Sequence, residues 1–279
     1  MAILVAKADG SKQLFEKGKI ISTCLKMGAN METADAIARK IENKVYDGIQ
    51  SRKIFTMISR ELGRYMPTVR HLTDLRRALS LMKPKPDFEK FIQLVFIEHG
   101  YEVTPNPIIR GKCVEHELDA MARKNGKTLI IEVKHHYNRH ILTGLDVTRI
   151  ARAIFEDISE GYTLGLNSVN PERALVVSNT KFSDHANRYA QCRGIENLGW
   201  NTPTGRGLEK MIEDKQLFPL TYLRNLDPMV RNRIMGHGII LLKQLVSCDL
   251  DELSGKMRIP KNRLASTFEI AKMILFGKD

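Results

Sequence analysis

Two carboxylates and an amine in the middle of the chain have the types and spacing of a metal-dependent hydrolytic site. Asp119 is followed, after twelve residues, by Glu132-Val133-Lys134. Alternate side chains of a strand face the same way, so Glu132 and Lys134 project together. Asp119 falls on the partner strand of a predicted hairpin, which brings its carboxylate beside Glu132. Such a pair suits Mg²⁺ or Mn²⁺, and the lysine can orient an attacking water at a phosphodiester.

Predicted helices and strands around these residues supply the frame. Asn125-Gly126 is a strong turn pair and predicts a hairpin of strands 117–122 and 128–134. Apolar spacing predicts a helix over 146–160 with Ile150, Ile154 and Ile158 inward. The other elements expected in this segment are a helix over 87–99, a strand over 100–103, a strand over 174–177 and a helix over 184–193.

The segment from Asp87 to Trp200 resembles the PD-(D/E)xK nuclease superfamily, in particular its Mrr-like restriction endonucleases. The residues that carry this resemblance are Glu89 in Phe88-Glu89-Lys90-Phe91, Asp119 in Glu117-Leu118-Asp119, and Glu132-Val133-Lys134. The resemblance implies a restriction-endonuclease-like αβ core. It further implies that Asp119 and Glu132 bind metal, that Lys134 activates water, and that Glu89 supports the metal site or a proton transfer. Leu118 stands where the motif has proline.

Other titratable residues near this motif have a structural interpretation as well. His135, His136 and His140 follow the lysine where the chain should leave its strand. We expect them to contact phosphate or lie on the surface rather than bind metal. Asp146 and Asp157 are expected to cap or brace the helix behind the site.

The first 83 residues form a separate pattern. A β-type run over 3–7, a turn at Asp9-Gly10 and a returning strand over 13–15 predict a hairpin, and helices are expected over 19–27, 32–46, 51–65 and 73–82, with Ser51 as an N-cap. Lys7 and Lys19 are point charges suited to a triphosphate.

This segment resembles an ATP-cone, the small regulatory domain familiar from ribonucleotide reductases. The matching residues are Val5-Ala6-Lys7, Asp9-Gly10, Phe15, Lys19-Ile20 and Tyr46-Asp47-Gly48-Ile49, followed by Ser51 and Ile54. The resemblance implies a pocket for ATP or dATP as an effector, lined by Val5, Lys7, Gln13, Lys19 and Ser51. The sequence has no GxxxxGK[ST], so a P-loop ATPase is unsupported. The alternative is a degenerate cone kept for packing or dimerisation.

The last segment is expected to be all-helical. Its Met235-Gly236-His237-Gly238-Ile239 turn resembles a helix-hairpin-helix, which implies that the backbone at Gly236 and Gly238 holds DNA phosphate. Lys261 and Arg263 extend a basic stretch nearby and are the other candidate DNA-binding residues.

Charge and composition agree with a nucleic-acid partner. The 279 residues carry a net charge of +12, distributed as +9 over residues 1–86, −1 over 87–219 and +4 over 220–279. Basic ends around a neutral middle suit a polyanion held at the ends and processed at the centre. Four cysteines without CxxC spacing argue against a zinc site and for a reducing cytoplasm, and no apolar run approaches a membrane span.

The expected organisation is a multidomain α/β (α+β) protein. Proline-rich and turn-rich segments at 83–87 and 201–207 divide it into an ATP-cone over 1–83, a nuclease domain over 84–203 and a helical module over 204–279. The predicted function is a Mg²⁺-dependent DNA endonuclease regulated by ATP or dATP, and a homodimer would supply two active sites for two strands. The alternatives are a nucleotide-sensing DNA-binding protein that does not cut, and a junction-resolvase-like nuclease.

Overall fold

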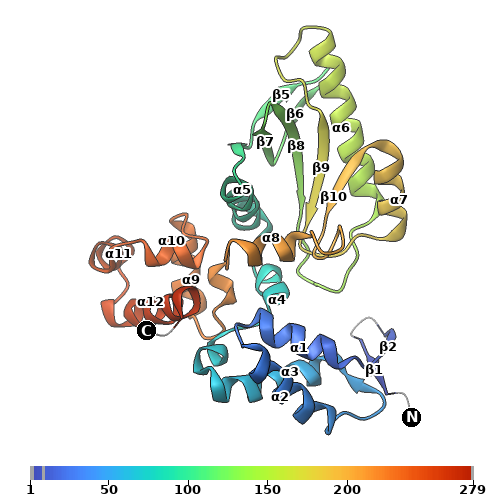
Figure 1. The fold of residues 1–279 in the computed structure, drawn as a ribbon. Coiled ribbons are helices and arrows are strands. Elements are labelled where there is room, and N and C mark those ends of the chain that lie inside the picture. The colour runs from blue at the N-terminus through green and yellow to red at the C-terminus, as the bar shows by residue number, and fades with distance from the viewer. Residues whose placement is uncertain (1–2, 8–9, 278–279) are drawn as a thin grey trace. The chain divides into compact units, whose positions relative to one another are not determined.

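The computed structural model describes residues 3–7 and 10–277 (Figure 1). Contacts within the chain divide it into two compact units. The smaller unit comprises the residues up to Leu72 together with the chain end from Lys272, and the larger unit comprises Thr73–Ala271. These units are not the three predicted domains of 1–83, 84–203 and 204–279, which remain a prediction.

The smaller unit combines a three-stranded sheet with helices. Strand β1 (Leu4–Ala6) lies between β2 (Lys12–Leu14), which is antiparallel to it, and β3 (Ile49–Gln50), which is parallel. Apolar side chains of α1 (Lys17–Lys26), α2 (Met31–Glu42) and α3 (Ser51–Tyr65) form one core with this sheet, because their apolar residues recur at helical spacing. A 3₁₀ turn over Pro67–His71 follows.

The predicted hairpin is confirmed by the pairing of β1 with β2, although its turn residue Asp9 lies outside the described residues. The expected helix over 51–65 matches α3. Ser51 is not its N-cap, however, because Gln50 occupies that position and Ser51 is the first helical residue. Strand β3 was not predicted, since two residues are too few to show an alternating pattern.

The larger unit contains a five-stranded mixed sheet. Its strands are β4 (Glu102–Pro105), β7 (Ala120–Lys124), β8 (Lys127–Lys134), β9 (Arg173–Ser178) and β10 (Ile195–Leu198), in the order β10-β9-β8-β7-β4. The β4-β7 and β7-β8 pairs are antiparallel, while β8-β9 and β9-β10 are parallel. A separate antiparallel pair consists of β5 (Ile108–Arg110) and β6 (Glu115–Glu117).

Helices cover both faces of this sheet (Figure 1). Helices α6 (Leu145–Thr163) and α7 (Asp184–Arg193) share a buried apolar cluster with the sheet, and α5 (Glu89–Glu98) lies against β4 and β7 on the other side. Short helix α4 (Leu75–Ser80) and the segment Pro84–Phe88, in which the backbone of Lys85 is extended, lead into α5. The predicted helix over 184–193 and the predicted turn at Asn125-Gly126 are confirmed, the latter with positive φ at both residues.

Two details of this unit differ from the sequence-based expectation. The hairpin strand begins at Ala120 rather than at Glu117, because residues 115–117 pair with β5 instead. Ile158 is fully buried and Ile154 is partly buried, but Ile150 is 55% exposed. A spacing of four residues drifts by about 40° around an α-helix at each step, so two steps carry Ile150 away from the buried face.

The remaining helices and strands named for the larger unit, from Leu208 onward, are all helices, as predicted. They are α8 (Leu208–Asp214), a 3₁₀ turn over Leu220–Tyr222, α9 (Pro228–Gly236), α10 (Leu242–Val246), α11 (Leu250–Met257) and the first part of α12 (Lys261–Phe276). The structure is therefore mixed α/β, which confirms the coarse fold class. No helix in the described part of the chain is long and apolar enough to cross a membrane.

Candidate active site

Pairing of the hairpin strands brings Asp119 next to Glu132 and Lys134. Ala120 pairs with Ile131, so Asp119, one residue before β7, lies level with Glu132. The Asp119 carboxylate accepts a hydrogen bond of 2.7 Å from the backbone N–H of Val133. This bond holds the carboxylate against β8 between the two predicted site residues of that strand.

Glu89 joins this group from the first turn of α5 through Lys85. The Lys85 Nζ lies 2.9 Å from Glu89 Oε1 and 3.2 Å from Asp119 Oδ1. Glu89 and Asp119 are each only 6% exposed, whereas the Lys85 side chain is 65% exposed. Two buried carboxylates from distant parts of the chain therefore share one ammonium group that reaches them from solvent.

Lys85 is a residue of this candidate site that sequence reasoning missed, because its segment was interpreted only as a stiff spacer. Its backbone is extended, with φ −117° and ψ 138°, as expected for a residue that precedes proline. Two sequence signals could have identified it: Glu89 lies four residues ahead, and Glu89 begins a helix.

The electrostatics of the site indicate a shortage of positive charge. Burial raises the pKa of Glu132 to about 7, and the charge of Asp119 adds to this effect while that of Lys85 opposes it. Burial also raises the pKa of Glu89, against the hydrogen bond from Lys85. Conversely, its hydrogen bond to Glu89 raises the pKa of Lys85. The charge of Asp119 thus disfavours the ionisation of both glutamates.

Lys134 is exposed at the end of β8, and its charge lowers the pKa of Glu132. The structure therefore gathers the four predicted catalytic residues, Glu89, Asp119, Glu132 and Lys134, around the same end of β8. The hydrogen bond from Val133 to Asp119 and the ion pairs of Lys85 link β8, the residue before β7 and α5, and the charge of Lys134 acts on Glu132.

The donor set of this site fits a hard divalent cation. No group of three or more His, Cys, Asp or Glu with the geometry of a preformed metal site occurs among residues 3–7 and 10–277. Mg²⁺ retains several waters, however, and one or two carboxylates suffice to hold it. The Lys85 ammonium already occupies a cation position between Glu89 and Asp119, and its exposed side chain can move away.

Contrary to the expectation, His135 and His136 are partly buried and hydrogen-bonded within the protein rather than surface groups. His135 Nε2 donates to the carbonyl oxygen of Leu79 at 3.0 Å, and the His136 ring lies 3.2 Å from Thr143 Oγ1. Burial lowers the pKa of both rings, which favours their neutral forms. His140 is exposed, as expected.

Asp157 braces a loop against α6, as predicted. Its carboxylate accepts hydrogen bonds from the backbone N–H groups of Cys113 and Val114, at 2.8 Å and 3.3 Å, and lies 2.8 Å from His116 Nε2. Asp146 lies in the first turn of α6, whose N-cap is Gly144.

Most of the predicted nucleotide-binding residues lie around the small sheet of the other unit. Val5 is buried in β1 and pairs with Gln13 on one side and with Ile49 on the other. Ser51 directly follows β3, and Lys7 directly follows β1. Lys19 lies in α1, where its ammonium pairs with Glu16 at 2.6 Å.

The predicted DNA-binding residues of the last segment are accessible. Gly236 ends α9 and Gly238 has a φ of +85°, and a Cβ added at either position would meet no atom within 4 Å. Lys261 and Arg263 are exposed at the start of α12, although Lys261 pairs with Asp251 at 2.6 Å.

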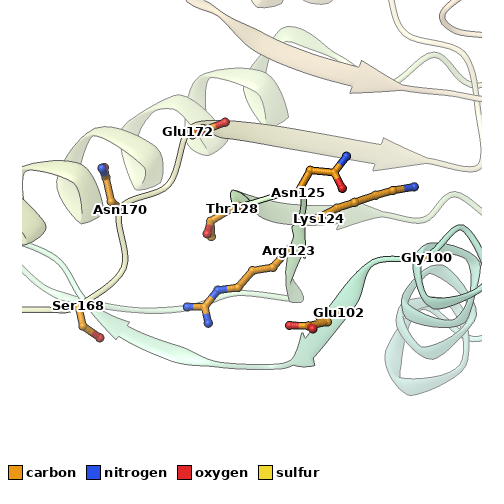
Figure 2. Close-up of a pocket in the computed structure, with 10 residues that line it drawn as sticks. Gly100, Glu102, Arg123, Lys124, Asn125, Thr128, Ser168, Asn170 and Glu172 are labelled. Carbon is orange, nitrogen blue, oxygen red and sulfur yellow. The ribbon is translucent and has the colours of Figure 1, made fainter.

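A cleft of about 570 Å³ lies at the opposite end of β7 and β8, beside the Asn125-Gly126 turn (Figure 2). Its lining includes Glu102 and Arg123 from the paired strands β4 and β7, and Glu172, the residue before β9. All three side chains are exposed. Sequence reasoning gave no sign of this cleft. It is an open groove with mixed charges, separate from the buried carboxylates of the candidate active site.

Comparisons with known proteins found a relative of similar sequence and a solved structure of similar fold. An uncharacterized protein of Archaeoglobus fulgidus is 36% identical over 157 residues, which cover 56% of this chain and 84% of that protein. A crystal structure of the protein of unknown function AF1548 has a TM-score of 0.58 at 30% identity, over 68% of this chain and 97% of that one. No protein-family model matches the chain. This level of identity and coverage shows that the chain belongs to the same family as the uncharacterized Archaeoglobus fulgidus protein.

Proposed function

We propose that this protein is a metal-dependent endonuclease that hydrolyses phosphodiester bonds in DNA. The observation that carries the proposal is the meeting of buried Asp119 and Glu89 with Glu132 and Lys134 at one end of β8. Buried carboxylates are costly unless they are paired, and two exposed lysines, Lys85 and Lys134, for three acidic groups leave a demand for further positive charge. Asp119 and Glu132 would hold Mg²⁺ or Mn²⁺.

Each residue of the site has a distinct role in this proposal. The bound cation would polarise the scissile phosphate. The exposed Lys134 ammonium would orient the attacking water and offset negative charge as the phosphorus becomes five-coordinate. Glu89, which shares Lys85 with Asp119, would support the metal site or a proton transfer. The Val133 N–H fixes the Asp119 carboxylate, so the metal would meet a ligand that is already oriented.

The other unit would regulate this activity by binding ATP or dATP as an effector. Support comes from the location of Val5, Gln13, Lys7 and Ser51 around one small sheet, next to the start of the fifteen-residue helix α3. Backbone N–H groups at a helix start favour phosphate. The accessible glycines of the last segment, Gly236 and Gly238, would hold DNA backbone.

Cleavage of supercoiled plasmid with Mg²⁺ tests this function. Wild type should nick or linearise the plasmid, and Asp119→Ala and Lys134→Ala should each remove the activity. Lys127→Ala is the matched control, because Lys127 is an exposed lysine of the same strand β8. A wild type that does not cut under any metal condition would refute the nuclease and favour the alternative, a nucleotide-sensing DNA-binding protein.

Two additions to this assay define the activity further. Including ATP or dATP should change the rate, and Lys7→Ala should remove that change while leaving the basal rate intact. Comparing linear duplex with a four-way junction separates a general endonuclease from a junction-resolvase-like one. We also propose a homodimer that works in the cytoplasm, and gel filtration with DNA and nucleotide present should show twice the monomer mass.

A further inference from the structure

The chain that leaves β8 after Lys134 forms an exposed loop of unusual composition, residues 137–142, which we call the Tyr137 loop. Three of its six side chains are large, apolar or aromatic, and exposed: Tyr137 at 66%, Ile141 at 47% and Leu142 at 51%. Single exposed apolar residues are ordinary, but several within one short loop indicate an interaction surface.

Buried polar residues fix both ends of the Tyr137 loop. Asn179 accepts a hydrogen bond from the His136 N–H and donates one to the His136 carbonyl oxygen, both at 2.8 Å. At the other end, Thr143 Oγ1 lies 2.8 Å from Ser178 Oγ and 3.0 Å from Thr180 Oγ1. Asn179, Thr143, Ser178 and Thr180 are all fully buried. The loop is therefore exposed although hydrogen bonds to buried residues fix both of its ends.

Two edge-on contacts between aromatic rings hold Tyr137 in a defined orientation. The fully buried ring of Phe88 meets the His135 ring edge-on at 5.0 Å, and the His135 ring meets the Tyr137 ring edge-on at 5.0 Å. The His135 ring is held in turn by its bond to the Leu79 carbonyl oxygen. Tyr137 thus presents an exposed aromatic ring on a rigid support, which is the geometry of a stacking platform.

The charge of the loop and of the residues that lead into it favours a polyanionic partner. From Lys134 to Leu142 the chain carries Lys134 and Arg139 and contains no acidic residue. A polyanion whose subunits also have flat apolar faces matches this combination of positive charge and exposed aromatic surface. Lys134, the residue expected to act on the attacking water, is only three residues from Tyr137.

We propose that Tyr137 stacks on an unpaired base of DNA next to the scissile phosphate. The preferred substrate would then be DNA with a single-stranded segment, such as a bubble or a flap, rather than continuous duplex, because bases in a duplex are already stacked on one another. This inference rests on the proposed nuclease function for the position of the scissile phosphate, but base stacking itself requires no cleavage.

Binding in the presence of EDTA tests the inference without any cleavage. The probes are a single-stranded oligonucleotide, a bubble duplex and a fully paired duplex, the first two with 2-aminopurine at an unpaired position. Wild type should bind the single strand and the bubble more tightly than the duplex and should quench 2-aminopurine. Tyr137→Ala should weaken binding to both by about tenfold and lose the quenching, since one stacked base contributes about 1–3 kcal/mol.

Control variants separate stacking from a general loss of structure. Tyr137→Trp should keep both tight binding and quenching, because indole also stacks. Tyr162→Ala is the matched control, since Tyr162 is an exposed tyrosine of α6 in the same unit, and it should bind all probes like wild type. The salt dependence of binding should be the same for Tyr137→Ala and wild type, because no charge has changed.

Three results would overturn the inference: unchanged binding and quenching in Tyr137→Ala, an equal loss for the duplex and the bubble, or tighter, Tyr137-dependent binding to single-stranded RNA of the same sequence. The assay also keeps this inference distinct from the proposed function. Loss of quenching in Tyr137→Ala combined with no plasmid cleavage by wild type would support the stacking site and refute the nuclease.

Discussion

Replacing Lys85 by methionine should tighten Mg²⁺ binding and, at the same time, destabilise the metal-free protein. The reason is that the Lys85 ammonium pairs with Asp119, one of the two proposed metal ligands, and with Glu89 beside it. Without it, the two buried carboxylates lose their positive partner, and a metal ion no longer has to displace it. Methionine keeps the length and most of the apolar volume of the side chain.

The distances give the size of both effects. Because the Lys85 side chain is 65% exposed, a water-like dielectric applies, and unit charges at 2.9 Å and 3.2 Å then attract by about 1.4 and 1.3 kcal/mol. Side-chain ordering reduces the total to roughly 1–2 kcal/mol. The metal-free variant should be less stable by this amount, and its affinity for Mg²⁺ should rise roughly 5- to 30-fold.

Two measurements check the prediction. Urea unfolding in EDTA gives the stability of the metal-free protein, and calorimetric titration with Mg²⁺ or Mn²⁺ gives the affinity without any nuclease assay. Lys90→Met is the matched control, because Lys90 is an exposed lysine next to Glu89 in helix α5, and it should alter neither quantity. Metal affinity in Lys85→Met that equals or falls below that of wild type would show that Lys85 and the metal do not compete for the same carboxylates.

Three further predictions concern the framework of the larger unit. Asn179→Ala removes both hydrogen bonds to the His136 main chain and should lower the free energy of unfolding by about 2–4 kcal/mol, measured as a lower urea midpoint with an unchanged slope. Ile158→Ala should lower the free energy of unfolding by about 2–5 kcal/mol because it opens a cavity, whereas Ile150→Ala, at an exposed position, should lower it by less than about 0.5 kcal/mol. Equal losses would contradict the burial of Ile158 and the exposure of Ile150 on α6. Burial tends to raise the pKa of Asp157, but hydrogen bonds from His116 and the Cys113 loop outweigh it and lower the pKa overall. Its contribution to stability is therefore present above the unfolded-state pKa and lost as the pH falls, so the difference in thermal midpoint between wild type and Asp157→Asn should shrink below about pH 4.

Local chemistry explains the elements that the sequence predicted well. The Asn125-Gly126 turn forms because both residues tolerate positive φ, and it sets the register that brings Asp119 level with Glu132. Helix α7 starts where predicted because the Ser183 side chain caps it by accepting from the Ala186 N–H. Such signals involve residues a few positions apart, so a single sequence displays them.

The failures have other physical causes. Strand β3 has two residues and forms because distant β1 supplies its hydrogen bonds, whereas β5 and β6 have three residues each, too few to show an alternating pattern. His135 and His136 look like surface residues from their polarity, yet the Leu79 carbonyl and Thr143 give them partners that make their partial burial tolerable.

By itself, the sequence determined the types of groups at the site, the hairpin that carries Asp119, Glu132 and Lys134, and the alternation of helices and strands around it. Only the tertiary structure decided that Lys85 would lie between Glu89 and Asp119, thirty-four residues from the latter, and that the Tyr137 ring would be held by the His135 ring, which packs on buried Phe88. Backbone preferences and periodicity act between neighbours along the chain, whereas burial and Coulomb attraction depend on which distant segments the fold brings into contact.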